Sequence, residues 1–292
     1  MIEVNLRTRP AVSADQQQIA NLILFQQQVH RHLDWHAPLE WLGYQPFFVL
    51  EKDGRITAAL ACPPDPPSIF WIRLFVFDSN LSGPSAWSPL WDAARRELIS
   101  LGNATVAAIV MQRWLQSILI ENGFASAQHI VMLEWSRQPY KAYAVPAGVT
   151  LRPMTMNDLP RVAEVDAAAF QPLWQNSLPA LTKAFSQAVY ASVAENESGI
   201  VGYQLSTGNP HGAHLARLAV CPEAQGRGMA SALISDLMDR VCGDENLSRI
   251  TVNTQSDNSS SLALYEKIGF RRTGEQYPVY IYRVEEDYGT TG

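Results

Sequence analysis

Residues 218–230 contain the residue types and the spacing that would hold a phosphate group. The apolar stretch Leu218-Ala219-Val220 is followed by a loop with two glycines, Gln225-Gly226-Arg227-Gly228, and then by Met229-Ala230. Glycine lets a backbone approach a ligand closely, and the first N–H groups of a helix have no carbonyl partner. Because the start of a helix also carries a partial positive charge, the loop predicts a site for an anion, most simply a pyrophosphate.

A strand before this loop and a helix after it would position these groups. The helix is predicted by apolar residues that recur at three- and four-residue steps, namely Ala230, Leu233, Ile234, Leu237, Met238 and Val241. Two other kinds of phosphate loop do not fit. No Gly-Lys-Ser/Thr follows, as a Walker A loop requires, and Ser231 stands where a dinucleotide-binding fingerprint has its third glycine.

A second segment, residues 258–270, has the pattern of a capped helix. It follows an expected strand at residues 249–253. Asn258 or Ser259 can cap the start of the helix, and Gly269 can end it.

Together the two segments resemble the GNAT superfamily, the acyl-CoA-dependent N-acyltransferases. The pyrophosphate loop of that family, Gln/Arg-x-x-Gly-x-Gly/Ala, is matched by Gln225, Gly228 and Ala230. Its later signature, Asn-x-x-Ala-x-x-Leu-Tyr-x-x-x-Gly-Phe, is matched by Asn258, Leu264, Tyr265, Gly269 and Phe270, with Ser261 in place of the alanine. The resemblance covers residues 148–284 strongly and the first half only faintly.

The resemblance implies acetyl-CoA as cosubstrate and a primary amine of a small molecule or peptide as acceptor. The strand Leu218-Ala219-Val220 would hydrogen-bond the pantetheine arm, and the N–H groups from Gln225 to Ala230 would hold the pyrophosphate. Arg227 would add positive charge. Asn258 would reach the pantetheine arm, cap its helix, or do both.

The same resemblance makes Tyr265 the candidate general acid, because a tyrosine at this position lies beside the thioester sulfur. A phenol with an ordinary pKa of ~10 is protonated at neutral pH and can donate a proton to a departing thiolate. The general base is less evident. Many relatives carry a glutamate before the loop, where this chain has Ala216 and Arg217. His214 is the nearest candidate in sequence, and Glu164 and Asp166, on the helix that opens the second half, are candidates that would act through a water.

Near-constant offsets between the two halves predict an internal duplication. Arg73 aligns with Arg217 at an offset of 217 − 73 = 144, and Gly123 aligns with Gly269 at 269 − 123 = 146. We therefore expect an α/β (α+β) protein with two tandem GNAT-type domains, residues 1–145 and 146–292, joined near residues 143–148. Each half is expected to follow the order β-α-α-β-β-β-α-β-α-β-β, a mixed, mostly antiparallel twisted sheet flanked by helices.

The first half lacks the residues that would bind the pyrophosphate and donate the proton in the second half. At the offset of 144, Pro84 replaces Gly228 and has no N–H to donate, and at the offset of 146, Leu119 replaces Tyr265. We expect a degenerate, non-catalytic copy.

Composition limits the remaining possibilities. A length of 292 residues suits two domains, and a net charge of −6 without a basic run argues against a nucleic-acid partner. No apolar run is long enough to span a membrane, and the sequence starts without a signal-peptide pattern. The three cysteines are expected to be reduced in a cytoplasmic protein. Of the histidines at 30, 32 and 36, only His32 and His36 would share a helix face, and no fourth ligand is evident, so no metal is expected.

Two alternatives remain open. A non-catalytic acyl-CoA-binding regulator is favoured by the missing glutamate and disfavoured by the retained Tyr265. A tandem acetyltransferase similar to mycothiol synthase shares the same plan. A pure interaction scaffold is disfavoured because it has no use for the loop from Gln225 to Ala230.

Overall fold

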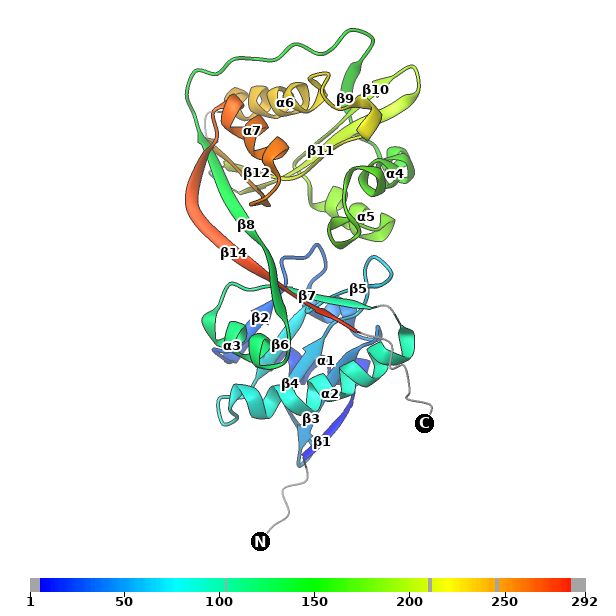
Figure 1. The fold of residues 1–292 in the computed structure, drawn as a ribbon, viewed down its shortest axis with the longest axis vertical. Coiled ribbons are helices and arrows are strands. Elements are labelled where there is room, and N and C mark those ends of the chain that lie inside the picture. The colour runs from blue at the N-terminus through cyan, green and yellow to red at the C-terminus, as the bar shows by residue number, and fades with distance from the viewer. Residues whose placement is uncertain (1–5, 103, 210–211, 245–246, 285–292) are drawn as a thin grey trace, which may run out of the picture. The chain divides into compact units, whose positions relative to one another are not determined.

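A computed structural model describes residues 6–102, 104–209, 212–244 and 247–284. The chain forms two compact units (Figure 1). The first unit comprises the residues up to Ala127 and those from Pro278 onward, and the second comprises Gln128–Tyr277. The strands form a five-stranded antiparallel sheet and a nine-stranded sheet that is mixed and mostly antiparallel, and helices flank them, which confirms the predicted fold class.

The first unit contains these strands and helices in chain order: β1 (Leu6–Pro10), η1 (Ser13–Asp15), α1 (Gln16–Phe25), β2 (Val29–Arg31), η2 (Pro38–Trp41), β3 (Phe47–Lys52), β4 (Arg55–Ala61), β5 (Ile69–Trp71), β6 (Leu74–Phe77), α2 (Gly83–Leu101), β7 (Thr105–Ile109), α3 (Arg113–Glu121) and the start of β8 (Ala125–Ser136). One sheet has the order β1-β3-β4-β6-β2. Strand β7 pairs with β5 in parallel, and with the end of β14 (Arg271–Arg283) in antiparallel fashion.

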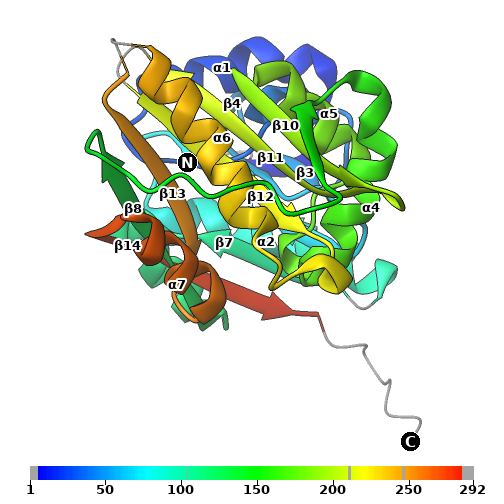
Figure 2. The same cartoon turned by 90° about the horizontal axis from the view of Figure 1, so that it is seen from above.

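The second unit contains the rest of β8 and the start of β14, together with β9 (Thr150–Pro153), η3 (Met156–Asp158), α4 (Leu159–Ala169), η4 (Pro172–Trp174), α5 (Leu178–Gln187), β10 (Tyr190–Asn196), β11 (Gly199–Asn209), β12 (Gly212–Val220), η5 (Pro222–Ala224), α6 (Met229–Gly243), β13 (Arg249–Gln255) and α7 (Ser259–Ile268). Its strand order from β8 is β8-β13-β12-β11-β10-β9. Helix α6 lies across the sheet from β10 to β13 (Figure 2). The predicted helices after the glycine loop and after Asn258 are both present.

The compact units differ from the expected division at residues 145 and 146. Strand β8 pairs with β13 from Ile130 to Ser136, and Trp135 is fully buried in the core of the second unit. The end of β14 pairs with β7 of the first unit. Long-range strand pairing therefore determines the division, and a chain cut at residue 146 would remove β8 from the second unit.

The first unit also departs from the predicted order of elements, because its second helix is absent. The segment after α1 forms the short strand β2 and the turn η2 instead. In the second unit the corresponding segment forms α5, whose start is capped by Ser177 accepting from the Ala180 N–H. His32 and His36 therefore do not share a helix face. Among the described residues, no group of His, Cys, Asp or Glu could hold a metal ion.

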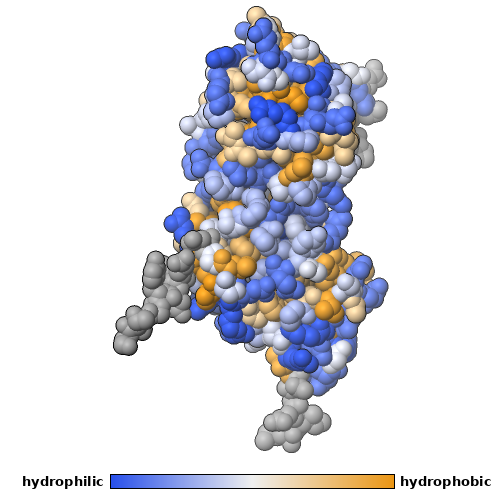
Figure 3. Space-filling model, turned by 90° about the vertical axis from the view of Figure 1, so that its right-hand side faces the viewer, coloured by the Kyte–Doolittle hydropathy of each residue, from blue (hydrophilic) through white to orange (hydrophobic). Residues whose placement is uncertain are grey.

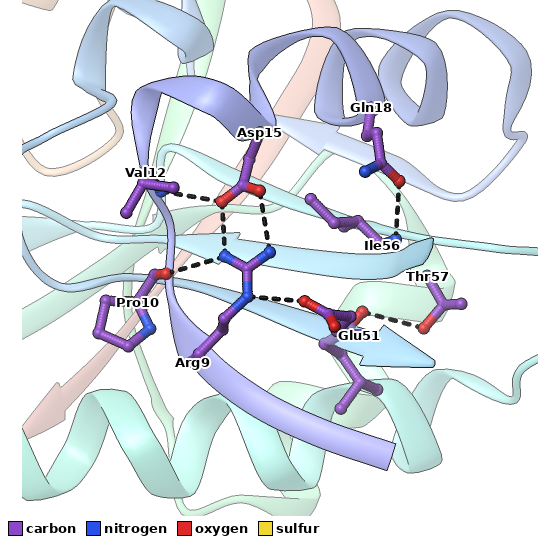
Figure 4. Close-up of polar contacts among 9 residues, drawn as sticks. Arg9, Pro10, Val12, Asp15, Gln18, Glu51, Ile56 and Thr57 are labelled. Atoms are coloured by element: carbon purple, nitrogen blue, oxygen red, sulfur yellow. Dashed lines mark hydrogen bonds and ion pairs between the residues drawn. The ribbon is translucent and has the colours of Figure 1, made fainter. Parts of the chain in front are cut away.

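A repeated ion-pair network supports the duplication at the level of atoms. In the first unit, the Arg9 guanidinium donates to both carboxylate oxygens of Asp15 at 2.7 and 2.9 Å, and its Nε donates to Glu51 at 2.7 Å (Figure 4). In the second unit, Arg152 donates to Asp158 at 2.8 and 2.9 Å and to Glu195 at 2.7 Å.

The backbone around this network repeats as well. A register shift lies between Leu50 and Glu51 in the first unit and between Ala194 and Glu195 in the second. The offset of the two shifted glutamates is 195 − 51 = 144, the same as that predicted from the sequence. The two units are therefore copies of one plan.

On the face visible in Figure 3, hydrophobic residues form separate patches among hydrophilic residues on each unit. No helix within the described ranges is long and apolar enough to cross a membrane.

Candidate active site

Strand β12 separates from its neighbour β13 partway along its length. From Gly212 to Leu215 it pairs with β13 in parallel, and no pairing with β13 continues beyond Leu215 in the described residues. Its pairing with β11 continues to Val220, with a register shift that leaves Ala216 without a partner. Because such a bulge increases the local twist, the strand turns away from β13 and one backbone edge of Leu218-Ala219-Val220 stays open.

The loop that follows this open edge has the backbone geometry that its glycines allow. Gly226 and Gly228 have φ angles of +73° and +86°, a region that other L-residues rarely adopt. The Gln225 side chain fixes the loop to the strand by donating to the carbonyl of Val220 at 3.0 Å. No backbone acceptor in the described part of the chain pairs with the N–H groups from Gly226 to Ser231.

Arg227 is exposed and Met229 is buried, so the loop presents its cation to solvent and anchors itself through the thioether side chain. The open N–H groups, Arg227 and the start of the 15-residue helix α6 together form a cradle for an anion. The residues predicted to hold pyrophosphate thus lie in one continuous loop.

Tyr265 lies within the same buried cluster as Leu215, and Leu218 packs against that cluster. The Tyr265 side chain is 5% exposed and contacts Phe270, and burial raises the pKa of its phenol. No hydrogen bond to another described residue is present at its hydroxyl group. Tyr265 is therefore protonated at neutral pH, with its hydroxyl available to a ligand.

Asn258 caps α7, because its Oδ1 accepts from the Ser261 N–H at 3.1 Å. This cap was one of the two roles expected for Asn258. Gly269 ends the helix with a φ of +109°.

The opposite face of β11 and β12 carries a buried ion pair. Side chains alternate between the two faces along a strand. On β11, position 202 faces Leu233 of α6, and the next residue, Tyr203, faces α4. There Arg217 donates to both oxygens of Asp166 at 2.7 and 2.8 Å. Asp166 is fully buried and also accepts from the Tyr203 hydroxyl and, at 2.7 Å, from the Asn176 N–H.

Arg217 also holds the loop after α4. It donates to the carbonyl of Trp174 at 2.6 Å, and its guanidinium lies 3.6 Å from the centre of the Phe170 ring. From the sequence, Arg217 is notable for its alignment with Arg73 and for standing where many relatives carry a glutamate, and not for a role in the site. The pairing with Asp166 joins residues 51 positions apart, and a buried Asp in an apolar helix face is the one local signal of it.

The other two candidate bases, Glu164 and His214, lie in different surroundings. Glu164 is exposed and pairs with Arg161 at 2.6 Å. His214 lies on the same face of β12 as Arg217, two residues before the bulge, and its Nδ1 is 2.9 Å from the Thr251 hydroxyl. Burial lowers the pKa of His214, so its imidazole is neutral at physiological pH.

Two further residues near the loop were not identified from the sequence as site neighbours. The predicted domain linker packs on the second unit, where the Tyr143 N–H donates to the Ser235 hydroxyl of α6 at 3.0 Å. Pro146 lies beside the loop, 4.0 Å from where a Cβ on Gly228 would stand.

Cys221, at the end of β12, is buried, which raises the pKa of its thiol and opposes a reactive role.

Comparison with protein families identifies the second unit. Residues 159–279 match the family described as "Acetyltransferase (GNAT) domain". A curated relative, the N-alpha-acetyltransferase RimI of Mycobacterium tuberculosis, is 29% identical over 133 residues, which is 43% of this chain and 80% of the relative. These matches confirm the resemblance drawn from the two sequence motifs.

Solved structures agree on the fold over almost the whole chain. A GCN5-related N-acetyltransferase from Sphaerobacter thermophilus superposes with a TM-score of 0.62 at 18% identity, covering 96% of both chains. A tandem GNAT protein from the clavulanic acid biosynthesis pathway gives 0.65 at 16% identity, covering 96% of this chain and 99% of the other.

The buried pair gives a testable difference between two acids on one helix. Asp166→Asn should lower the free energy of unfolding by about 3–5 kcal/mol, because it leaves the Arg217 charge buried without a partner. Glu164→Gln makes the same chemical change at an exposed ion pair and should cost at most ~1 kcal/mol. Urea denaturation of both variants measures this, and equal losses would contradict a special role for Asp166.

Proposed function

We propose, from the premise that this chain belongs to the GNAT superfamily of acyltransferases, that its second unit transfers an acetyl group from acetyl-CoA to a primary amine of a small molecule or peptide. The observation that carries the proposal is the open edge of Leu218-Ala219-Val220, which leads directly into the loop of unpaired N–H groups. An extended chain of amides followed by a pyrophosphate has the chemistry that complements this surface.

The fit of acetyl-CoA rests on two kinds of group in this chain. Amides of the pantetheine arm can pair with the open backbone edge as a neighbouring strand would. The N–H groups from Gly226 to Ala230, with Arg227, can hold the pyrophosphate at the start of α6. Asn258 is placed at the start of α7, where its side-chain Nδ2 remains available to the pantetheine arm beside its weak contact with Gln255 at 3.4 Å.

Tyr265 supplies the proton in the proposed reaction. The amine attacks the thioester carbonyl, the carbon–sulfur bond breaks, and the phenol protonates the thiolate as it leaves. Burial raises the pKa of Tyr265, so the group is fully protonated beforehand. The acceptor amine must lose a proton before it attacks.

His214 is the proposed base. It is neutral, half-buried and on the same face of β12 as Arg217. Asp166 accepts hydrogen bonds from Arg217, Tyr203 and Asn176, so its oxygens are occupied. Glu164 points to solvent with Arg161, so His214 is the preferred one of the three candidates named from the sequence.

The first unit is proposed to be non-catalytic, and the reaction to take place in the cytoplasm, where free thiols such as those of Cys62, Cys221 and Cys242 persist. A non-catalytic acyl-CoA-binding regulator shares every donor-binding feature described above. It is distinguished by turnover, because a regulator binds acetyl-CoA without consuming it.

The role of the loop from Gln225 to Ala230 in binding acetyl-CoA can be tested with two glycines that have similar φ angles. Gly228→Pro should abolish acetyl-CoA binding in calorimetry, because proline cannot adopt a φ of +86° and removes one N–H. Gly199→Pro is the matched control, since Gly199 has a φ of +96° in a hairpin remote from the loop in sequence. Equal affinity of the Gly228 variant and the unaltered chain would exclude the loop as the phosphate site.

Tyr265→Phe keeps the ring packing and removes the proton. Turnover should fall by about 10²–10⁴-fold with little change in acetyl-CoA affinity, since a positioned acid acts on the transition state. Steady-state kinetics with an amine panel and calorimetry test this together. An unchanged turnover number, with the chemical step limiting, would remove Tyr265 from the mechanism.

His214→Gln tests the base. In the unaltered chain, kcat/KM should fall only at pH values below the usual histidine range, because the pKa of His214 is lowered and the neutral form is the active one. The glutamine variant should lose that acid limb and most of the rate. If rate and pH profile are both retained, the amine reaches the site already deprotonated and His214 has no catalytic role.

A further inference from the structure

The first unit keeps the separation of strands that forms the donor slot in the second. Its strand β5 pairs in parallel with β7, and the chain then passes to β6, which pairs with β4. The change occurs between neighbouring residues, since the Ile72 N–H donates to Ala107 of β7 and the Arg73 N–H donates to Ala61 of β4, both at 2.8 Å.

At the offset of 144, Ile72 and Arg73 correspond to Ala216 and Arg217, so this point is the first unit's counterpart of the bulge in β12. At the offset of 144, Leu74, Phe75 and Val76 correspond to Leu218, Ala219 and Val220. Strand β6 is therefore the first unit's counterpart of the strand with the open edge.

In the first unit that edge is occupied by the protein itself. Strand β2 pairs with β6 in antiparallel register, with Val29 opposite Val76, His30 opposite Phe75 and Arg31 opposite Leu74. The pairing extends one residue further, where the His32 N–H donates to the carbonyl of Arg73 at 3.0 Å. All three positions that correspond to the predicted pantetheine strand are covered.

The side chain of His30 fills the point where the strands part. Its Nε2 is 2.9 Å from the carbonyl of Ile72, the residue at the separation, and the residue is 4% exposed. Since a carbonyl accepts, Nε2 donates there. Burial lowers the pKa of His30 to about 4, so the ring stays neutral. At the offset of 144, β2 corresponds in the second unit to residues 173–175, where the chain forms the turn η4 before α5, and none of the described strands pairs with the open edge of β12.

We propose that β2 occupies the first unit's donor slot in place of the amide-bearing arm of acyl-CoA, an internal contact that closes this slot permanently and leaves one donor site per chain. The inference rests on the proposed function for the identity of the donor. Loss of the phosphate-binding loop at Pro84 alone would weaken a donor, whereas an occupied backbone edge excludes it.

Hydrogen–deuterium exchange on the full chain tests this, with and without saturating acetyl-CoA. Peptides covering Val29–Arg31 and Leu74–Val76 should be protected in both states and unchanged by the ligand. In the peptide covering Leu218–Val220, the amides on the open edge should exchange rapidly alone and at least ~10-fold more slowly with acetyl-CoA, as newly formed backbone hydrogen bonds require, whereas the amides paired with β11 should be protected in both states.

A matched pair of variants tests β2 directly. His30→Pro removes a central N–H of β2 and should raise exchange at Leu74–Val76 by ~10-fold or more, with α2 still protected as evidence of a folded unit. Leu33→Pro, placed just after β2 at a residue that is 62% exposed, should leave that exchange unchanged.

The outcomes separate the two proposals. Rapid exchange of β2 in the unaltered chain, or new protection at Leu74–Val76 on adding acetyl-CoA, would overturn the closed slot. A protected β2 with no response at Leu218–Val220 would overturn the proposed donor site while supporting the closure of the first unit.

Discussion

The separation of β12 from β13 after Leu215 is the constraint on which the rest of the second unit depends. A strand inside a sheet normally has both backbone edges paired, because an unpaired buried N–H or carbonyl costs free energy. Here the unpaired Ala216 turns the strand, and Leu218-Ala219-Val220 keep one edge free. The sheet therefore carries an incomplete ladder of hydrogen bonds that a ligand with its own amides can complete.

The Asp166–Arg217 pair joins α4 to β12 directly after the bulge, on the opposite face from α6. A buried ion pair contributes little net stability unless every polar atom is satisfied. Asp166 meets that condition through Arg217, Tyr203 and Asn176, and Arg217 also holds the Trp174 carbonyl. In the first unit, Arg73 pairs with Asp34 at 2.5 Å and lies 4.3 Å from the ring of Trp41, although that unit has no open edge. A cluster of an arginine, an acid and an aromatic ring therefore recurs in both units. In the second unit it attaches the loop after α4 to β12.

The sequence predicted those parts of the structure that depend on local patterns. Apolar periodicity located α6, and the glycine and asparagine caps located α7. Near-constant offsets predicted the duplication. The matching hydrogen bonds of Arg9 in the first unit and Arg152 in the second support it. The family resemblance rested on two motifs whose residues lie in one loop and one helix.

What the sequence did not reveal depends on pairing between distant segments. Strand β2 has only three residues, too few to show the alternation of apolar and polar residues that indicates a strand. It is formed by its backbone pairing with β6, a segment more than 40 residues later. The division at residue 127 follows from β8 pairing with β13 more than 110 residues later. The pairing of Asp166 with Arg217 is likewise a contact between elements, and neither residue type indicates its partner.

The most direct test of the account is a crystal structure of the full chain grown with coenzyme A. We expect density for the pantetheine arm along Leu218–Val220, with the pyrophosphate at the N–H groups of Gly226 to Ala230 and β2 still paired with β6. Density for the arm along Leu74–Val76, or a pyrophosphate held away from the loop of the second unit, would contradict it.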